Sequence, residues 1–430
     1  MDFRYNDRTA KLVEEVREFV NAEVIPSEQL HLQQVADSGE PYRRPPILEE
    51  LRAKARDAGL WNLFLPTTEW GGRGLSNLEF APVFEEMGRA HHGPEVFNCQ
   101  GPDSGNMMAL AACGTPEQQK QWLLPLLEGG ITSCFAMTEP EVASSDLRNI
   151  KATIERDGDE FVINGRKWFS SGSVRDNCKI CLFVGVSDPD AEPHPGKSMV
   201  LVPLETPGVE VVRDMTVFGY RQTIGHGELL FTDVRVPVSN LLEEPGSRVG
   251  QSRLGPGRLW HAMRSIGLSE RALEMMCLRV ASRETFGRTL ADHGVVRDWI
   301  ARSRIEIEQT RLLALRAAWT MDEVGGLLAA REVALIKVAC AKLLLDIVDR
   351  AIQAHGAMGL GQDTILPEMY GYARSLRFVD GPDEVHIRSL GRWEVKGQVM
   401  AAEAAAAAAA ERAATAEATS PAAESATPTV

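Results

Sequence analysis

An acidic turn near the C-terminus contains the first candidate for proton-transfer chemistry. It reads Val-Asp-Gly-Pro-Asp-Glu-Val over residues 379–385. Residues 381–384 have the pattern of a helix start, with proline at the first helical position and acidic side chains in the first turn. Asp380 lies just ahead of that start, which leaves its carboxylate free to project into a site. A carboxylate positioned in this way can serve as a general base.

Two earlier segments combine hydroxyl groups with aromatic rings, as a binding site for a flat polar heterocycle would. Residues 135–146 read Phe-Ala-Met-Thr-Glu-Pro-Glu-Val-Ala-Ser-Ser-Asp and predict a loop with free backbone amides. Residues 164–172 read Asn-Gly-Arg-Lys-Trp-Phe-Ser-Ser-Gly and place two aromatic rings beside two serines on a predicted strand. The competing interpretations are an ordinary turn around Pro140 and a tryptophan, Trp168, packed in a β core.

Two segments of the C-terminal half complete the set. Residues 283–288 read Arg-Glu-Thr-Phe-Gly-Arg, and the guanidinium of Arg283 could clamp a pyrophosphate through two hydrogen bonds. The competing interpretation is a helix end, with Gly287 just past the last helical residue. Residues 353–359 read Gln-Ala-His-Gly-Ala-Met-Gly and precede the acidic turn, and we count them together with that turn as the fourth segment. Their glycine spacing does not match a dinucleotide-binding fingerprint.

The composition is that of an ordinary globular protein of two or three domains, and it excludes several function classes. The chain has 430 residues, of which 44% are apolar and 25% charged. A formal net charge of −14 argues against broad nucleic-acid binding, which needs a basic surface. No stretch approaches the roughly 20 apolar residues of a membrane span. The charged N-terminus lacks the apolar core of a signal peptide, so a cytoplasmic location is the default expectation.

The seven cysteines do not suggest a disulfide or metal framework. Their number is odd and they are scattered through a long chain, as reduced thiols are. Cys178 and Cys181 form a CxxC pair, but no second pair completes a zinc site. The pair lies on a predicted strand, so we interpret it as packing and expect no bound metal.

Helical periodicity predicts an N-terminal domain over residues 1–131. Apolar residues recur at helical spacing between residues 12 and 20. Thr115, Pro116 and Gln118 predict a capped helix start, with proline at the first position and glutamine at the third. The further helical runs are expected at 47–58, 77–89 and 116–127.

Short β-branched runs follow and predict a middle β domain over residues 132–245. Residues 150–156 and 161–169 flank an Asp-Gly-Asp turn, which is a hairpin signal. The later runs are separated by Gly, Pro and Asp turns, with no helix between them. This pattern favours an antiparallel sandwich or barrel over a parallel sheet.

Residues 246–398 predict a helix bundle, and residues 399–430 predict an alanine-rich tail. Long helical stretches have apolar stripes too wide for one exposed face, and packing into a bundle buries them. They lie at 261–282, 295–322 and 328–354. The tail is rich in Ala and then in Ser, Thr and Pro, and we expect a frayed helix and a disordered end. The predicted fold class is α+β, with helices, a β domain and a helix bundle in that order.

In this order and at these separations, the four segments resemble the acyl-CoA dehydrogenase family across residues 1 to about 398. Thr138-Glu139-Pro140 resembles the TEP motif that lies over the flavin, and residues 167–170 resemble the strand that stacks on the isoalloxazine. The variants TEPxVASSD, KWxSSG, QAHGAMG and DGPDEVH are similar to the branch of family members 10 and 11. The resemblance implies an N-terminal all-α domain, a middle β-barrel or sandwich, a C-terminal four-helix bundle, and FAD as cofactor.

The resemblance also implies roles for individual residues. Asp380 is the implied catalytic base, and Ser145 and Gly381 are implied substrate contacts. Arg283 and Phe286 resemble the segment that reaches FAD across a subunit boundary, which implies a homodimer or homotetramer. The residues implied to contact FAD are Phe135, Met137, Thr138, Ser144, Ser145, Trp168, Phe169, Ser170, Arg283, Phe286, Gln353, Gly356, Pro382, Asp383 and Glu384.

Three departures from the family pattern bear on these roles. Most members have Glu-Gly-Thr where this chain has Asp-Gly-Pro over residues 380–382, so the carboxylate is one methylene shorter. The TEP loop has one residue more than the usual TEPxAGSD, which leaves the register of Ser144 and Ser145 open. Gly294 stands where many members have glutamine, so one hydrogen bond to FAD is expected to be missing.

The implied reaction is the α,β-dehydrogenation of an acyl-CoA thioester to a trans-2-enoyl-CoA, a step of the fatty acid β-oxidation type. Asp380 takes the α-proton, the β-hydrogen leaves as hydride to flavin N5, and electrons pass to an electron-transferring flavoprotein. One alternative is a flavin oxidase of the same superfamily that uses oxygen on an acyl-CoA or a nitroalkane, since nitroalkane oxidase uses an aspartate base. The other alternative is a non-catalytic scaffold that keeps the fold. Acyl chain length, branching and 4-hydroxy tolerance stay open.

Overall fold

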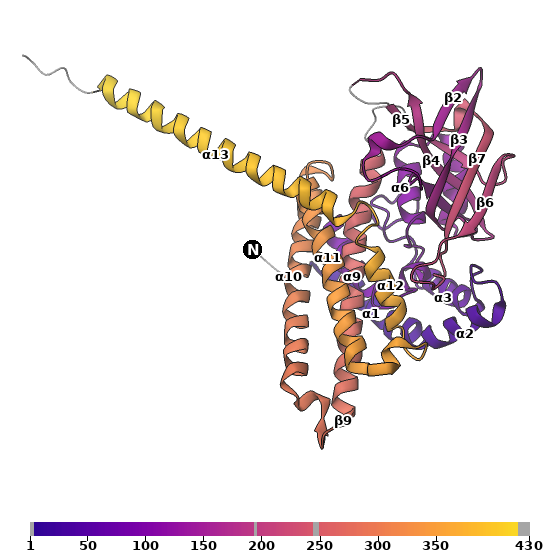
Figure 1. Ribbon diagram of the computed structural model, residues 1–430, viewed down its shortest axis with the longest axis vertical. Helices are drawn as coiled ribbons and strands as arrows, with labels where there is room; N and C mark the ends of the chain where they lie inside the picture. Colours follow the sequence, from indigo (N-terminus) through magenta and orange to yellow (C-terminus); the bar gives the residue numbers. More distant parts are fainter. Residues whose placement is uncertain (1–3, 193–195, 244–248, 420–430) are drawn as a thin grey trace, which may run out of the picture.

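The chain folds into an N-terminal group of helices, a β-sheet and a C-terminal helix bundle, in the predicted order (Figure 1). The computed structural model describes residues 4–192, 196–243 and 249–419. The predicted α+β class is confirmed. The predicted domain boundaries stay predictions, and the boundary at 245/246 lies outside the described residues.

Short helices make up the N-terminal part. The predicted capped start at Thr115 is present as a full capping box, because Thr115 Oγ1 accepts from Gln118 N and Gln118 Oε1 accepts from Thr115 N. The run after it departs from a regular α-helix and widens into a π-helical segment before Pro125, whose ring would clash inside a regular turn. The elements are α1 (Asp7–Phe19), η1 (Val20–Val24), η2 (Ile25–Ser27), α2 (Glu28–Ser38), α3 (Pro46–Asp57), α4 (Asn77–Met87), α5 (Gly93–Val96), α6 (Asp103–Cys113), α7 (Pro116–Gln118), η3 (Gln119–Leu123) and α8 (Leu124–Leu127).

The middle part is one eight-stranded sheet with the order β6-β7-β3-β2-β4-β5-β8, and β1 also pairs with β4. The predicted hairpin is β2 and β3, with Gly158 at a positive φ of 62° in its turn. Most pairs are antiparallel, but β4 runs parallel to both β1 and β2, and the connection from β1 to β4 is long because it contains that hairpin. The strands are β1 (Thr132–Ala136), β2 (Thr153–Asp157), β3 (Glu160–Ser171), β4 (Cys178–Asp188), β5 (Gly196–Pro203), β6 (Val209–Asp214), β7 (His226–Pro237) and β8 (Leu241–Glu243).

Strand β4 is buried on both faces and joins two hydrophobic cores. Ile180 and Leu182 face the core that the helices share, whereas Cys181 and Phe183 face the core within the sheet. Side chains alternate along a strand, so a nearly continuous apolar run is the pattern of a strand covered on both sides. The sheet is therefore fixed against the helices, and loops at its edge are held in place relative to the bundle.

The C-terminal part is dominated by three long antiparallel helices, which agrees with the predicted bundle (Figure 1). Helix α11 packs against α9, α10, α12 and α13. A tight hairpin of β9 and β10 joins α9 to α10 at one end of the bundle, and α13 leaves near the other end (Figure 1). The elements are α9 (Val249–Ser282), β9 (Glu284–Thr285), β10 (Arg288–Thr289), α10 (Gly294–Val324), α11 (Ala330–His355), η7 (Gly356–Leu360), α12 (Leu366–Ser375) and α13 (Asp383–Thr419).

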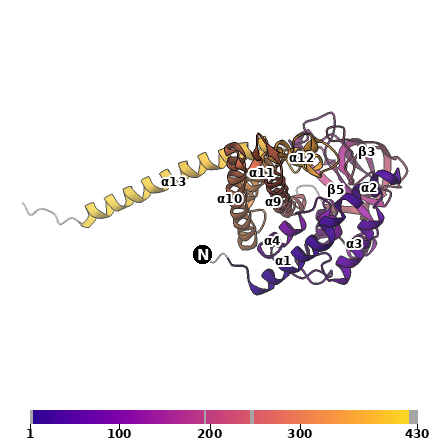
Figure 2. The ribbon, with the colours of Figure 1, turned by 90° about the horizontal axis from the view of Figure 1, so that it is seen from below.

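The alanine-rich segment from residue 399, where a frayed helix and then a disordered end are expected, is helical as far as the structure describes it. Helix α13 continues through it to Thr419 and projects away from the bundle (Figures 1 and 2). Alanine has the highest intrinsic helix propensity, so an unbroken alanine run extends a helix that has already started. Residues 420–430 lie outside the described residues.

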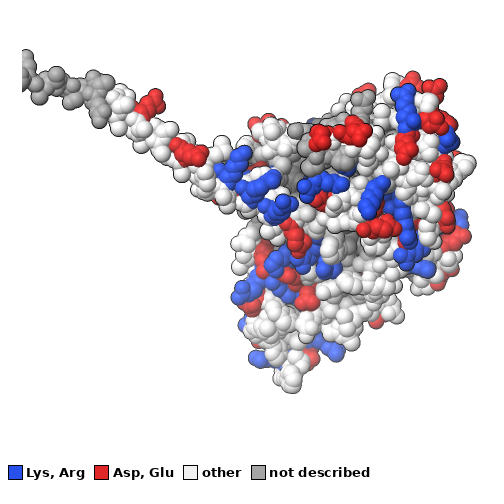
Figure 3. Space-filling view, turned by 45° about the horizontal axis from the view of Figure 1, so that its top comes forward, with Lys and Arg blue, Asp and Glu red and all other residues white. Residues whose placement is uncertain are grey.

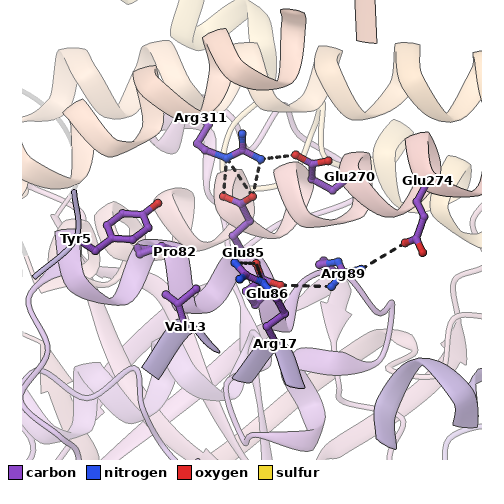
Figure 4. Close-up of a pocket in the computed structure, with 10 residues that line it drawn as sticks. All are labelled: Tyr5, Val13, Arg17, Pro82, Glu85, Glu86, Arg89, Glu270, Glu274 and Arg311. Atoms are coloured by element: carbon purple, nitrogen blue, oxygen red, sulfur yellow. Dashed lines mark hydrogen bonds and ion pairs between the residues drawn. The ribbon is translucent and has the colours of Figure 1, made fainter. Parts of the chain in front are cut away.

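A charged cavity of about 400 Å³ lies where α1 and α4 meet α9 and α10 (Figure 4). Arg311 on α10 makes two hydrogen bonds of 3.1 Å and one of 2.8 Å to Glu85 on α4, and it also pairs with Glu270 on α9. Burial raises the pKa of the Glu85 carboxyl, against the opposing effect of Arg311. None of the residues implied to bind flavin or substrate is among the ten that line this cavity. We therefore interpret it as part of the polar interface between the N-terminal helices and the bundle.

We expect Arg311→Met to lower the free energy of unfolding by about 3 kcal/mol, because it leaves the largely buried Glu85 carboxylate without its cation, whereas Glu270 keeps Arg304. Chemical denaturation measures the effect. The matched control is Arg302→Met, whose guanidinium pairs with Asp298 on the exposed face of the same helix. That change should cost less than about 1 kcal/mol. Equal losses of unfolding free energy in the two variants would contradict a role for Arg311 in joining the N-terminal helices to the bundle.

Candidate active site

Asp380 lies in the turn between α12 and α13 and adopts a left-handed backbone conformation, with φ of 56°. Its carbonyl oxygen accepts from Arg258 Nε at 3.1 Å and from His386 Nε2 at 3.2 Å. Its carboxylate Oδ2 lies 3.6 Å from His261 Nε2 on α9. A non-glycine residue in this conformation costs energy, and such strain is concentrated at functional sites. The carboxylate of Asp380 is therefore held by its backbone while its oxygens stay available.

Asp383 pins the turn that presents Asp380. Its carboxylate accepts from Arg377 Nε at 2.7 Å and from Lys337 Nζ at 3.4 Å, and Lys337 also donates to the carbonyl of Leu376 at 2.6 Å. Burial lowers the pKa of Lys337, and the nearby carboxylate of Asp383 opposes that shift. The structure thus commits Asp383, which the resemblance assigns to FAD, to internal ion pairs.

The glycine after Asp380 is required by the same turn. Gly381 has φ of 101°, which side chains rarely adopt, and an added Cβ would lie 3.0 Å from His386 Nε2. Pro382 is half-buried beside it, and Glu384 is exposed in the first turn of α13. The absence of a side chain at position 381 leaves the backbone next to the carboxylate open to a close approach.

A buried ion pair joins the loop after β1 to strand β3. Lys167 Nζ lies 2.8 Å from Glu139 Oε1 and donates to the carbonyl of Met137 at 2.9 Å. The Glu139 carboxylate also accepts from the backbone amides of Lys151 and Ala152, both at 2.9 Å. Burial alone would raise the pKa of Glu139, but the hydrogen bond and charge of Lys167 hold it below its usual value. The Thr-Glu-Pro loop is therefore fixed on the strand that carries Trp168.

Strand β3 turns its aromatic pair outward at a β-bulge. The pairing of β3 with β7 shifts between Lys167 and Ser170, and Phe169 within the bulge has φ of 48°. The rings of Trp168 and Phe169 meet edge to face at 5.4 Å, and Phe169 is 43% exposed. Bulges re-aim side chains and are frequent beside active sites. Here the bulge presents an aromatic face next to the Thr-Glu-Pro loop, where Trp168 N donates to the carbonyl of Thr138.

The two serines of the loop point to different environments. Ser144 is buried, and its hydroxyl accepts from the backbone amide of Glu139 at 2.8 Å, so it closes the loop on itself. Ser145 is exposed. Phe135 and Met137 are half-buried and Thr138 is exposed along the same segment. The structure therefore leaves Ser145 rather than Ser144 free to contact a ligand.

The remaining predicted residues lie at the other end of the bundle, at the hairpin that joins α9 to α10 (Figure 1). Arg283 is exposed, and Phe286 is 95% exposed with φ of 52°. Gln353 and Gly356 are exposed at the end of α11. This end of α11 lies near Arg279 of α9, whose charge adds to the effect of burial in lowering the pKa of His355. The structure does not bring these residues to Asp380 within one chain.

Several residues of the site escape sequence reasoning. Lys337 had a usable signal, because a lysine within an apolar run of a helix needs a buried partner. The sequence points to Lys167 only as part of the strand segment, where it follows Arg166 in a polar stretch that gives no sign of its burial. Arg258, His261 and Tyr372 had none, since each stands alone on a helix with no local pattern. The partners of all five are distant in sequence, which is why only the folded chain identifies them.

Three family models match the chain almost from end to end. They are the N-terminal domain of acyl-CoA dehydrogenases over residues 6–130, the middle domain over 134–234 and the C-terminal domain over 244–395. The chain belongs to the acyl-CoA dehydrogenase family. The resemblance drawn from the four sequence segments is thereby confirmed, and so is the fold class that it implied.

Similar proteins come from animals and bacteria. Acyl-CoA dehydrogenase family member 11 of Gallus gallus is 49% identical over 391 residues, which are 89% of this chain and 50% of that protein. FadE2 of Mycobacterium tuberculosis, named as a probable acyl-CoA dehydrogenase, is 51% identical over 85% of this chain and 89% of its own length. A solved structure of an acyl-CoA dehydrogenase candidate from Mycobacterium abscessus has a TM-score of 0.89 and 48% identity, and covers 92% of this chain and 100% of its own. This chain spans about half the length of the Gallus gallus relative.

The site residues fit the isoalloxazine ring of FAD, the cofactor of this family. Ser170 Oγ is buried and has no hydrogen-bond partner among the described residues, and it lies beside the aromatic face of Trp168 and Phe169. A buried hydroxyl without a partner is costly unless a ligand satisfies it. A flat, polar-edged ring over this face would do so.

Other ligand classes gain no support from the described residues. Within residues 4–192, 196–243 and 249–419, no group of three or more His, Cys, Asp or Glu side chains could hold a metal ion. Acidic and basic side chains are interspersed over the face in Figure 3, so that face presents no extended basic surface for nucleic acid. None of the helices in the described ranges is long and apolar enough to span a bilayer.

Proposed function

We propose that this chain catalyses the FAD-dependent α,β-dehydrogenation of an acyl-CoA thioester, with Asp380 as the base that takes the α-proton. The observation that carries this proposal is the presentation of Asp380. A pinned turn holds its backbone in a strained conformation, and its carboxylate is only 19% exposed. A general base needs such fixed geometry and limited access to water. The resemblance places a glutamate at this position in most relatives.

Different residues of the chain then contact the substrate and the flavin. Gly381 leaves room for the thioester beside its backbone amide, which can stabilise the negative charge that develops on the oxygen. Ser170 and the ring of Trp168 would hold the edge of the flavin when it is bound, and the Thr-Glu-Pro loop would cover it. FAD, when bound, supplies the acceptor for the β-hydrogen and its electrons. An electron-transferring flavoprotein is the proposed acceptor from the reduced enzyme.

The hairpin at the far end of the bundle is proposed to serve a second subunit. Arg283 and Phe286 are exposed, and the C-terminal end of α11, which carries Gln353, lies at the same end of the bundle as their hairpin (Figure 1). An aromatic ring that is 95% exposed is unusual on the surface of a monomer and typical of a protein–protein interface. We therefore assign these residues to the FAD of a neighbouring copy, in a dimer or tetramer.

The test is an anaerobic visible spectrum of the purified protein, titrated with acyl-CoAs of short, medium and long chain. We expect a flavin band that at least one acyl-CoA bleaches, and the effective chain length then defines the substrate class. A flavin band that no acyl-CoA bleaches would contradict the proposal. Stoichiometric peroxide formation on admitting air would favour the oxidase alternative. Protein that binds no flavin after FAD is added would favour the scaffold.

A further inference from the structure

His261 faces the carboxylate of Asp380 from one turn beyond Arg258 on α9. Its Nε2 lies 3.6 Å from Asp380 Oδ2, and its Nδ1 lies 3.2 Å from the hydroxyl of Tyr372 on α12. The histidine side chain is 29% exposed. Three elements, α9, α12 and the turn before α13, therefore meet in one chain of polar contacts that ends on the proposed base.

The contact with Tyr372 favours one tautomer of His261. Tyr372 is buried, and the guanidinium of Arg264 lies 4.3 Å from the centre of its ring. Burial raises the pKa of Tyr372, although Arg264 opposes the shift, so the phenol keeps its proton. That O–H can donate to Nδ1 of a neutral imidazole, which then carries its hydrogen on Nε2. In that tautomer, the Nε2–H group is the one that lies 3.6 Å from Asp380 Oδ2.

The other groups around Asp380 act differently on it. Arg258 and His386 donate to its carbonyl oxygen, and Lys337 is held by Asp383 and by the carbonyl of Leu376. Burial lowers the pKa of Arg258, against the charge of Asp380, and burial followed by Arg258 lowers the pKa of His386. Among the described residues, the polar contact recorded for the Asp380 carboxylate itself is the one with His261.

We propose that His261 is a positioning residue for Asp380, and that its Nε2–H, fixed by Tyr372, donates to the carboxylate and orients it before proton transfer. This inference rests on the proposed role of Asp380 as base. The separation of 3.6 Å is longer than a hydrogen bond, and catalytic hydrogen bonds are often long until a substrate is bound. An aspartate is shorter than the usual glutamate, so it gains more from a partner that fixes its direction.

The test compares His261→Phe with His261→Gln, using the rate of flavin reduction by an acyl-CoA as a function of pH. We expect His261→Phe to reduce the rate at neutral pH about 10- to 100-fold and to move the acidic limb of the profile up by about one pH unit. The Kd of the acyl-CoA should stay nearly unchanged. Glutamine can place an N–H donor where Nε2 stands, so His261→Gln should restore most of the rate and return the acidic limb.

Tyr372→Phe tests the same chain without altering the histidine. It keeps the ring beneath Arg264 and removes the hydroxyl, so we expect a smaller loss of rate with a shift of the acidic limb in the same direction. FAD content and the thermal unfolding midpoint report whether each variant is folded. This variant keeps the inference testable if His261→Phe fails to fold.

Two results would overturn the inference, and a third concerns the proposed function instead. An unchanged rate and profile in His261→Phe would show that the histidine does not act on the base. Equal losses in His261→Phe and His261→Gln, with an unmoved acidic limb, would show that His261 only packs. If Asp380→Asn still reduces its flavin normally, the proposed base is wrong, whatever the histidine variants do.

Discussion

Replacing Asp380 with asparagine is expected to slow flavin reduction by an acyl-CoA about 10³-fold or more while leaving FAD bound. The amide has the shape of the carboxylate but cannot accept a proton. The turn should be unchanged, because Arg258 and His386 bond to the backbone carbonyl and Asp383 anchors the next residues. Anaerobic stopped-flow mixing measures the rate, and the visible spectrum of the purified variant measures bound FAD.

Asp380→Glu and Asp383→Asn are the matched companions of this variant. Glutamate keeps the base but adds a methylene, so retained activity would show that the site accepts the reach of the common family residue. Asp383→Asn removes an anchor, and we expect it to destabilise the turn while leaving some proton transfer. Full activity in Asp380→Asn would sink the assignment, and Asp383 or Glu384 would then be the carboxylates to examine.

Replacing Lys167 with methionine is expected to lower the free energy of unfolding by about 3 to 5 kcal/mol and to reduce FAD retention. Both side chains of the Lys167–Glu139 pair are essentially buried, at 0% and 3% exposure. Removal of the cation leaves the Glu139 carboxylate buried with only backbone donors. The Thr-Glu-Pro loop would then lose its anchor to the strand of Trp168. Chemical denaturation and the ratio of flavin to protein measure the two effects.

The matched control is Lys179→Met, which removes a lysine from an exposed position on β4 of the same sheet. We expect a change within about 0.5 kcal/mol. The double variant Lys167→Met/Glu139→Gln should recover part of the loss, because no charge is left buried. A loss in Lys167→Met no larger than in the control would contradict an essential ion pair.

The same pair gives a pH dependence with a defined sign. The pKa of Glu139 is lower in the folded state than its usual value, so its stabilising effect is present at neutral pH. That effect is lost as the pH falls through the lowered value. Glu139→Gln should therefore flatten the acid side of the stability profile relative to the parent protein.

Local sequence patterns predicted most of the secondary structure correctly. The hairpin of β2 and β3 follows from one Asp-Gly-Asp turn between alternating runs, and the capping box at Thr115 follows from residues within one helical turn. These features depend on neighbours in the chain, so the sequence carries them directly. Composition does not show how far a helix continues once it has started, so the extent of α13 to Thr419 came only from the structure.

The family and the candidate base also came from the sequence, because the four segments keep their order and separation. The function of those segments depends on partners that local patterns do not contain. Lys167 reaches back to Glu139 across the sheet, and Lys337 meets Asp383 from the middle of another helix. A charged side chain that is removed from water needs a counter-charge, which can come from any part of the fold. Hydrophobic periodicity does not show where in the sequence that counter-charge lies.

Asp380 shows the division most clearly. The sequence alone determined that the carboxylate of Asp380 precedes a helix start, because proline and acidic residues define that start. It also showed that Gly381 separates the two and gives the backbone conformational freedom there. Only the tertiary structure decided that the carboxylate faces His261, since that contact requires α9, α12 and the last turn to pack together. Local residues fix backbone conformation through sterics and capping, whereas the meeting of distant side chains depends on the packing of the whole core.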